Sequence, residues 1–262
     1  MKNIVISLQT AKARREHIEK EFGQQNISFE FFDAITPDKN QQYAEKFGLN
    51  LNSFNLKPTE ISCFLSHIYL WVYAEENNLE YIAIFEDDIY LGENANLFLT
   101  NASWIPNDID VLKLEAFDKY IEVDRSSVLN TLDNREIYHL ISKHIGGAGY
   151  IISHKIINKI LLRLKQEKKI KPLDHYLFED LILDNNTNIV QILPALCIQD
   201  FIKHSTYENF ASSLEEERRK RFNSIKVKLT FVQKLKREIL RLALQVKGIF
   251  RRIMYRKKVT FR

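Results

Sequence analysis

The chain has 262 residues and is poor in cysteine, proline and glycine, and each shortage excludes a class of protein. Its two cysteines, Cys63 and Cys197, are too few for a disulfide framework and form no CxxC pair, which is typical of a reducing compartment. Five prolines and seven glycines exclude collagen-like and linker-rich chains. Because 45% of the residues are hydrophobic, the chain can build a core and is not disordered throughout.

Long hydrophobic runs are also missing. The longest stretch without Asp, Glu, Lys or Arg is residues 61–74, and it contains two serines and a histidine. A membrane-spanning helix needs about 20 apolar residues. The apolar run at the beginning, within MKNIVISLQT, is too short for a signal peptide. We therefore expect a cytoplasmic protein without a transmembrane helix.

Charge is divided unevenly along the sequence. Residues 214–262 contain 17 Lys and Arg against 4 Asp and Glu, whereas residues 1–213 contain 21 basic and 30 acidic residues. The net charge is therefore +13 in the first range and −9 in the second. We predict an acidic globular body over residues 1–213 and a basic tail over residues 214–262.

The basic tail has the pattern of an amphipathic helix. Between residues 229 and 253, apolar side chains recur every three or four positions and are flanked by lysines and arginines. Basic amphipathic helices commonly lie in the membrane interface, so we expect the tail to bind an anionic membrane surface. A helix packed against the body or against a second copy is the alternative. The sequence predicts no oligomeric state.

The body alternates between strand-like and helix-like segments. Short apolar runs indicate strands at residues 3–8, 29–32, 81–85, 109–114, 150–152 and 189–193. Helical spacing marks residues 11–22, 60–76, 154–164 and 174–183, with Thr59 as the cap of the second helix. This alternation predicts an α/β sandwich with a mostly parallel sheet, in which ligands bind beyond the carboxyl ends of the strands.

Three acidic residues, Glu86, Asp87 and Asp88, directly follow the apolar run of residues 81–85. Adjacent carboxylates repel one another unless a cation neutralises them. Glu86 and Asp88 flank Asp87, so two of the three can face the same side, and their hard oxygens suit Mg²⁺ or Mn²⁺. The triplet predicts a divalent-cation site, and a solvated acidic turn is the alternative.

Two further segments are candidates for the site. Gly146, Gly147 and Gly149 concentrate three of the seven glycines within four residues, which indicates either close approach of a ligand or a tight turn. Pro172 and Asp174 stand at the predicted start of a helix, where Asp174 is either an N-cap or a general base that accepts a hydroxyl proton. Asp180 is the rival carboxylate for the second role.

Taken in order, these segments resemble glycosyltransferase family 25, the bacterial lipooligosaccharide glycosyltransferases. The resemblance covers residues 3–205. The motifs that carry it are Ile6-Ser7-Leu8 with Arg14-Arg15, Phe32-Asp33-Ala34-Ile35, Glu60-x-x-Cys63-x-x-Ser66-His67 with Trp71, Phe85-Glu86-Asp87-Asp88-Ile89, Gly149-Tyr150 and Pro172-Leu173-Asp174.

The resemblance implies a GT-A-type nucleotide-sugar-binding α/β/α sandwich and an inverting transfer of a hexose, most often galactose from UDP-galactose. It implies that Asp88 holds Mn²⁺ or Mg²⁺ in the manner of a DxD motif, and that Glu86 reaches either the metal or the ribose. For the transfer itself, we expect Asp174 to be the catalytic base. The acceptor would be a growing lipooligosaccharide at the inner face of the bacterial inner membrane. The resemblance places these residues around the UDP-sugar donor: Ser7, Leu8, Arg14, Asp33, Ala34, Glu60, Ser66, His67, Glu86, Asp87, Asp88, Gly147 and Gln199.

Two other functions use the same features. A metal-dependent nucleotide-sugar phosphohydrolase would also need clustered carboxylates, but it would not need a sugar acceptor. A nucleic-acid-binding protein could contact phosphates through the basic tail. Since the acidic body contains no recognised nucleic-acid-binding motif, we do not expect nucleic acid to be a partner.

Overall fold

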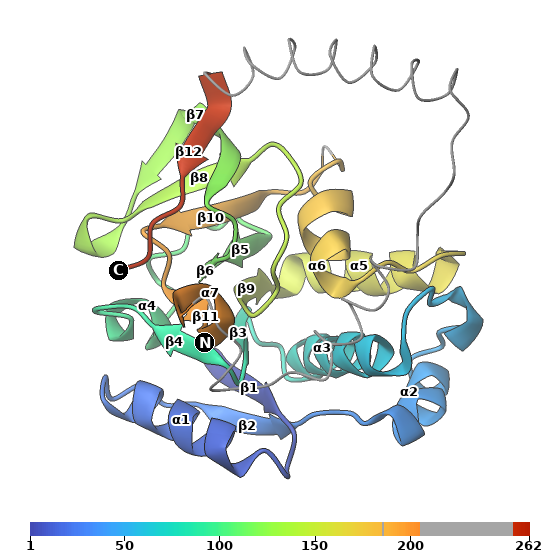
Figure 1. The fold of residues 1–262 in the computed structure, drawn as a ribbon. Helices are drawn as coiled ribbons and strands as arrows, with labels where there is room; N and C mark the ends of the chain where they lie inside the picture. Colours follow the sequence, from blue (N-terminus) through green and yellow to red (C-terminus); the bar gives the residue numbers. More distant parts are fainter. Residues whose placement is uncertain (185, 205–253) are drawn as a thin grey trace, which may run out of the picture.

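A nine-stranded sheet runs through the centre of the computed structural model, which describes residues 1–184, 186–204 and 254–262 (Figure 1). Its strand order is β2-β1-β3 on one side, then β9-β5-β10, then β8-β7-β12. The strands in this order span Glu30–Asp33, Lys2–Ser7, Tyr81–Glu86, Gly149–Ser153, Val111–Lys113, Ile189–Leu193, Glu136–Leu140, Tyr120–Asn130 and Arg256–Lys258.

The sheet is mixed, so the prediction of a mostly parallel sheet is wrong. β1 is parallel to β2 and β3, and β5 is parallel to β10. β9 is antiparallel to both of its neighbours, and β8, β7 and β12 are antiparallel to theirs. The short connection between β7 and β8 forces an antiparallel pair. Asp133 and Asn134 make this turn with positive φ, a conformation that Asp and Asn tolerate better than most residues.

A second sheet of three strands lies beside the acidic turn. Its order is β4-β11-β6, with bounds Ile89–Leu91, Cys197–Gln199 and Glu115–Ala116. β11 is antiparallel to β4, and the register places Gln199 opposite Ile89. This pairing brings the end of β11 next to residues 86–88.

Helices cover both faces of the large sheet, which confirms the predicted α/β sandwich. Alternate strand residues enter separate cores: Ile82 and Ile84 pack on one face, and Ala83 and Phe85 on the other. The first core also takes the apolar faces of α2 (Asn40–Lys46), α3 (Pro58–Glu76) and α5 (His154–Gln166). The second takes α1 (Lys12–Gly23) and α4 (Asn96–Leu99).

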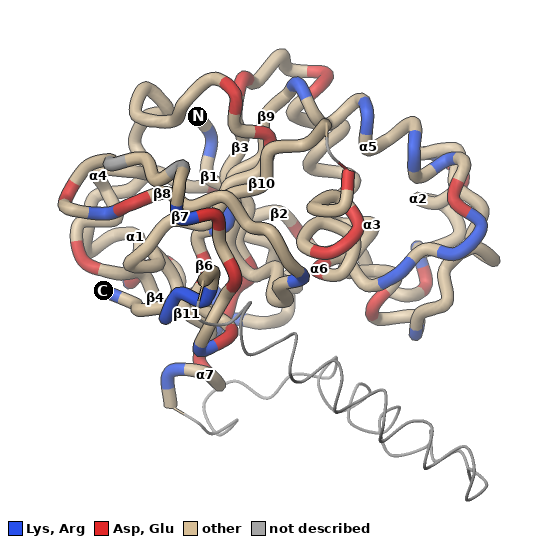
Figure 2. Tube along the Cα trace, turned by 90° about the horizontal axis from the view of Figure 1, so that it is seen from above, with Lys and Arg blue, Asp and Glu red and all other residues tan. Residues whose placement is uncertain are grey.

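α5 illustrates how the sequence produces this layering. Ile156, Ile157, Ile160 and Leu164 are buried at helical spacing. Lysines and arginines follow the helix between them, as the blue segments along α5 show (Figure 2). In the ranges described, none of the helices combines the length and apolar character that a membrane span requires.

Two predicted helices differ in detail. α3 begins at Pro58, after the cap residue Lys57, and so Thr59 lies inside the helix instead of capping it. The carboxylate of Glu60 accepts a hydrogen bond from the backbone N–H of Lys57 at 2.9 Å, which satisfies a backbone donor at the start of this helix. The predicted helix at 174–183 is shorter: α6 spans Leu173–His175 and continues as a π-helical turn over Tyr176–Asp180, with a non-helical Phe178.

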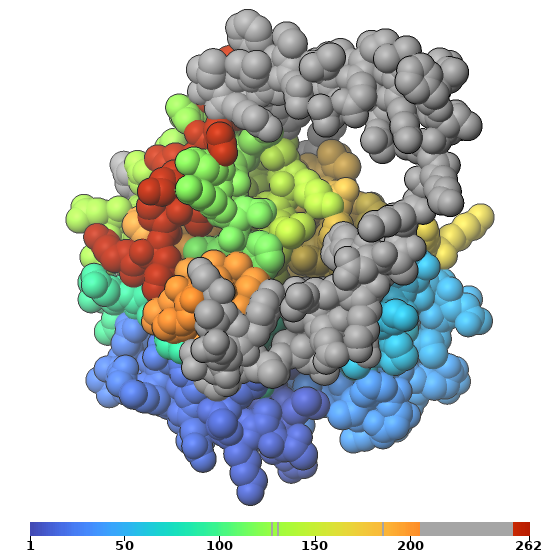
Figure 3. Space-filling model, in the orientation of Figure 1, coloured from blue at the N-terminus to red at the C-terminus, as the bar shows by residue number. Residues whose placement is uncertain are grey.

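The last residues of the chain belong to the sheet, which corrects the prediction of a helical tail extending to residue 262. Arg256, Lys257 and Lys258 form β12 against β7. Val259 is buried, and Phe261 forms a β-bridge with Ala195. Figure 3 shows this segment, in red, lying against the surface of the β7–β8 region. The predicted boundary near residue 213 and the apolar stripe of 229–253 lie outside the described residues.

Candidate active site

The carboxyl ends of β1, β2 and β3 bring the predicted residues Ser7, Asp33 and Glu86 to one edge of the sheet. The parallel register pairs Ile6 with Glu86 and Ser7 with Asp33. The backbone carbonyl oxygen of Ser7 accepts hydrogen bonds from Ala34 N at 2.9 Å and from the guanidinium of Arg15 at 3.1 Å. This edge is where ligands bind in open α/β sheets.

Asp87 is held by two side chains from the first βα unit. Ser7 Oγ donates to its Oδ2 at 2.7 Å, and Arg14 Nη1 donates to its Oδ1 at 2.6 Å. Burial opposes the charge on Arg14, but the carboxylates of Asp87 and Asp88 outweigh it and raise the pKa of Arg14. A fixed cation therefore lies beside the acidic turn, and both oxygens of Asp87 are engaged.

Asp88 and Glu86 are joined through Gln199. Gln199 Nε2 donates to Glu86 Oε2 at 3.2 Å and to Asp88 Oδ1 at 3.3 Å. Asp88 is only 8% exposed, and this burial raises its pKa although Arg14 and Gln199 oppose the shift. Two carboxylates that converge on one donor, one of them buried, fit the hard-oxygen ligand set of Mn²⁺ or Mg²⁺.

The loop after β1 and the end of β2 form a continuous patch beside these acids. Leu8 is exposed, and its carbonyl accepts Ala11 N at 3.0 Å at the start of α1. Asp33 forms an ion pair with Arg15, whose guanidinium also lies over the ring of Phe31. Arg15, which stands beside Arg14 in the motif that carries the family resemblance, therefore lies in this patch and is a further candidate for the site.

Two predicted contacts on α3 stabilise the protein's own backbone. Ser66 Oγ accepts Ile35 N at 2.9 Å and donates to Ser62 O at 2.8 Å, which anchors the loop after β2. Glu60 accepts the N–H of Lys57 at the start of the helix. Both side chains are buried.

His67 lies close to Glu86 of the acidic turn, and it is fully buried. Its Nδ1 is hydrogen-bonded to Tyr150 Oη at 2.8 Å, and Trp71 Nε1 donates to the same oxygen at 3.0 Å. Burial lowers the pKa of His67 to about 3, so the imidazole is neutral at physiological pH.

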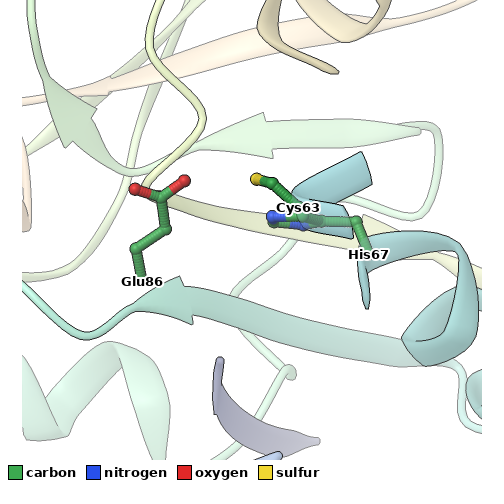
Figure 4. A group of neighbouring side chains, drawn as sticks. All are labelled: Cys63, His67 and Glu86. Carbon is green, nitrogen blue, oxygen red and sulfur yellow. The ribbon is translucent and has the colours of Figure 1, made fainter. Parts of the chain in front are cut away.

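Cys63, His67 and Glu86 form a second group around the end of β3. The Sγ atom, a ring nitrogen and a carboxylate oxygen of the three residues lie within 4.8 Å of one another. Figure 4 shows Cys63 and His67 projecting from α3 toward Glu86 at the end of β3. The sequence interpretation did not assign Cys63 to the site, although it stands one helical turn before His67.

The glycine cluster connects the acidic turn to Asp174. Gly146 has a φ of 92°, and a Cβ there would lie 2.7 Å from Glu115 Oε2, so this position needs glycine. Two residues later, Ala148 O accepts Glu86 N at 2.9 Å. Gly147 faces Asp174, since a Cβ built on it would lie 3.8 Å from Asp174 Cβ. Residues 146–148 therefore form a short backbone segment that contacts Asp174 at one end and Glu86 at the other.

Asp174 is half-buried and contacts the glycine segment. Its Oδ2 accepts Gly146 N at 3.3 Å, and its Oδ1 accepts His175 N at 2.9 Å. The cap residue of α6 is Pro172, so Asp174 is not the N-cap. The rival Asp180 forms an ion pair with Lys171 at 2.6 Å.

A buried ion pair that the sequence interpretation missed lies beneath the glycine segment. Lys113 and Glu115 are fully buried and lie 3.3 Å apart. Lys113 Nζ donates to Ile145 O at 3.0 Å and to Gly146 O, while Glu115 Oε2 accepts Ala148 N at 3.0 Å. The two charges thus fix both ends of the segment that contacts Asp174 and Glu86. Lys113 and Glu115 stand two positions apart at the end of a strand-like run, and this spacing was the sequence signal that could have indicated the buried pair.

Known proteins resemble this chain over most of its length. It is 43% identical to a protein of Haemophilus influenzae over 249 residues, which are 94% of this chain and 86% of that protein. It is 38% identical over 263 residues to the lipooligosaccharide biosynthesis protein lic2B of the same species, with 97% of this chain and 95% of that protein covered. It is 37% identical over 243 residues to the lacto-N-neotetraose biosynthesis glycosyltransferase LgtE of Neisseria gonorrhoeae, covering 87% and 86%.

A solved glycosyltransferase involved in glycosylation of the major capsid of PBCV-1 aligns with a TM-score of 0.39 at 10% identity, covering 82% of this chain and 96% of that one. The sequence pattern of glycosyltransferase family 25, described as LPS biosynthesis protein, matches residues 1–177. That range includes the acidic turn, α3, the glycine segment and Asp174. The family resemblance inferred from the motifs is confirmed, and the chain belongs to glycosyltransferase family 25.

Proposed function

We propose that the protein is an inverting hexosyltransferase of lipooligosaccharide biosynthesis that uses a UDP-hexose, with UDP-galactose as the first candidate. The observation that carries the proposal is the convergence of Glu86 and Asp88 on Gln199 at the carboxyl edge of the sheet. The names of two relatives, which refer to lipooligosaccharide and lacto-N-neotetraose biosynthesis, support an oligosaccharide acceptor.

In this proposal the first βα unit binds the nucleotide. Ser7, Leu8, Asp33 and Ala34 form one patch at the ends of β1 and β2, next to the acidic turn. Arg14 supplies a positive charge at the position where a diphosphate would approach, and Asp87 orients its guanidinium. Ser66 and Glu60 support this patch, because Ser66 anchors the loop after β2 and Glu60 stabilises the start of α3.

Glu86 and Asp88 are the residues that would hold Mn²⁺ or Mg²⁺, and Gln199 positions both carboxylates. The cation would supply electrostatic stabilisation for the negative charge on the leaving UDP. Arg14 lies 4.0 Å from Asp88 and reinforces the same positive potential.

Asp174 is the proposed base. The acceptor hydroxyl oxygen forms a bond to the anomeric carbon while the bond from that carbon to the UDP oxygen breaks, and Asp174 takes the hydroxyl proton. Attack on the face opposite UDP inverts the configuration. The backbone N–H of Gly146 donates to the carboxylate of Asp174, Lys113 donates to the carbonyl of Gly146, and Glu115 accepts the N–H of Ala148.

We also propose that residues 229–253 bring the enzyme to an anionic membrane surface. This proposal rests on their apolar stripe and basic flanks. A lipid-linked acceptor at the inner face of the inner membrane would be concentrated at the same surface.

The experiment that tests the proposed reaction supplies the protein with a panel of UDP-sugars, truncated lipooligosaccharide acceptors and Mn²⁺, and identifies products by mass. We expect one acceptor to gain a hexose. We also expect UDP release to depend on that acceptor. UDP release at the same rate without an acceptor would indicate a phosphohydrolase instead.

A further inference from the structure

We infer that Cys63, His67 and Glu86 form a binding site for a thiophilic divalent cation, with Zn²⁺ as the best fit. The three ligand atoms already lie within 4.8 Å of one another. Bonds of about 2.0–2.3 Å in a tetrahedral zinc site place ligand atoms roughly 3.3–3.8 Å apart, so small side-chain rotations would complete the site.

His67 provides the second, independent observation. Its Nε2 atom is buried and has no hydrogen-bond partner among the described residues. A buried polar atom without a partner costs free energy, and a bound cation would remove that cost. The other ring nitrogen is already engaged by Tyr150 Oη, which in turn accepts a hydrogen bond from Trp71. Ligating histidines in metal sites are commonly oriented through their second nitrogen in this way.

The helix supplies two ligands from adjacent turns. Cys63 and His67 are separated by four residues on α3, so both side chains project from the same face. Glu86 comes from the end of β3, and its Oε2 is bonded to Gln199. A metal bound through the carboxylate would therefore connect α3 to β3 at the edge of the acidic turn (Figure 4).

The ligand types distinguish this site from the one formed by Glu86 and Asp88. Sulfur and imidazole favour Zn²⁺ or Co²⁺, whereas Mn²⁺ and Mg²⁺ favour oxygen ligands. Cys63 and Glu86 are half-buried, so an ion can reach them from solvent, whereas His67 is fully buried on the inner side of the site. Three protein ligands would leave a fourth position for water. The inference does not depend on the proposed sugar transfer, although both sites use Glu86.

Cobalt tests the site because cobalt–thiolate bonds absorb strongly in the near ultraviolet. The full-length reduced protein is titrated with Co²⁺, and Zn²⁺ is then added. We expect a sulfur-to-cobalt charge-transfer band that saturates at one equivalent and disappears when Zn²⁺ displaces Co²⁺. Cys63→Ser should abolish the band. Cys197→Ala is the matched control, because Cys197 is the other cysteine and lies in the core at β11, and this variant should keep the band.

A band that persists in Cys63→Ser, or no band in the wild type, would overturn the inference. Circular dichroism shows whether the variants are folded. If Cys63→Ser does not fold, alkylation of the wild type replaces it: Zn²⁺ should slow modification of Cys63 at least tenfold, and an unchanged rate would reject the site. Asp88→Asn should retain the cobalt band even if it loses transfer, so failure of the zinc site and failure of the proposed function give different results.

Discussion

The side chain of Gln199 donates to the carboxylate of Asp88, which lies 111 positions earlier in the sequence. β11 holds Gln199 in register with Ile89, directly after the acidic turn. The contact therefore depends on a strand pair of the small sheet and not on local sequence. It also explains how Asp88 and Glu86 remain close together despite their charges.

We predict that transfer requires a divalent cation and that Asp88→Asn abolishes it. Removing one buried carboxylate from a cation site should cost several kcal/mol of transition-state stabilisation, or roughly a thousandfold in rate. Steady-state rates with Mn²⁺, with Mg²⁺ and in excess EDTA check the requirement. Full activity in EDTA would show that Glu86 and Asp88 do not serve as metal ligands during turnover.

For Asp174, we predict that the change to Asn lowers kcat by about 10²–10⁴-fold and leaves the Kd for UDP unchanged. Asn retains the shape and can still accept the N–H of Gly146, so the fold should be preserved. The base acts on the acceptor hydroxyl, which explains why UDP binding should not change. Rapid-quench rates and calorimetric UDP binding separate the two effects.

Asp180→Asn is the matched control for Asp174. It breaks a partly exposed ion pair with Lys171, and such pairs contribute about 0–1 kcal/mol to stability. Turnover should stay near the wild-type rate. A large loss in this variant, together with normal turnover in Asp174→Asn, would transfer the role of base to Asp180.

The local sequence predicted β1, β2, β3, β5, β9 and β10, and with them the carboxyl edge of the sheet, because these strands are short apolar runs, whereas β4, β6, β7, β8, β11 and β12 were not predicted. The alternation of Ile82, Ala83, Ile84 and Phe85 between two cores is seen only in the structure, because all four residues are apolar. The relation of Cys63 to Glu86 was not predictable in the same way, because it requires α3 to pack against β3 at a particular register. The antiparallel placement of β9 likewise depends on long-range pairing.

The end of the chain shows a further limit of sequence patterns. Arg256, Lys257 and Lys258 look like the continuation of a basic helix, but they pair with β7. Tyr120 and Tyr138 provide aromatic surfaces for Arg256 and Lys257, at 3.6 and 4.5 Å from the ring centroids. These partners are far away in the sequence, and only tertiary structure reveals them.

We predict that His144 makes the protein less stable at acidic pH. It is buried, and its burial lowers the pKa to about 4 although its contact with Asp118 opposes the shift. The unfolded value is about 6.5. The folded state therefore binds fewer protons in this range, and the stabilising effect of the neutral histidine is complete above pH 6.5 and is lost as pH falls toward 4. At pH 5 the loss should be about 2 kcal/mol relative to pH 8.

Urea unfolding of the wild type and of His144→Asn at pH 5, 6 and 8 checks this value. The variant should be less stable than the wild type at pH 8 but should have a shallower pH dependence. Asp88 and Glu115 have pKa values raised by burial, and they give a slope of the opposite sign, so the comparison with the variant is essential. Equal slopes in the two proteins would exclude a buried neutral His144.

We predict that Gly92→Ala destabilises the protein by displacing its C-terminal segment. A Cβ at this position would lie 2.1 Å from the backbone oxygen of Arg262. That oxygen accepts a hydrogen bond from the buried Arg135 at 2.7 Å. Loss of this contact should cost about 1–3 kcal/mol. Gly23→Ala is the control, since its Cβ would meet no atom within 4 Å, and its Tm should not decrease.

The last prediction concerns residues 229–253 and the proposed membrane surface. Deleting residues 226–262 is not a clean test, because it also removes β12 and the contact between Arg262 and Arg135. We therefore predict the effect of charge neutralisation: replacing Lys234, Lys236, Arg237 and Arg241 with Gln should abolish sedimentation with anionic vesicles at low salt. Each basic residue near an anionic leaflet contributes about 1 kcal/mol, so four changes should weaken binding by roughly 10³-fold. Transfer to a soluble acceptor should persist.

The matched control neutralises four basic residues of the body, Lys155, Lys165, Lys168 and Lys169, which lie on or just after α5 and are exposed. Both variants lose four positive charges, so only a specific role of the tail predicts different binding. Equal sedimentation of the two variants, or no binding by the wild type at low salt, would show that the tail does not dock on membranes.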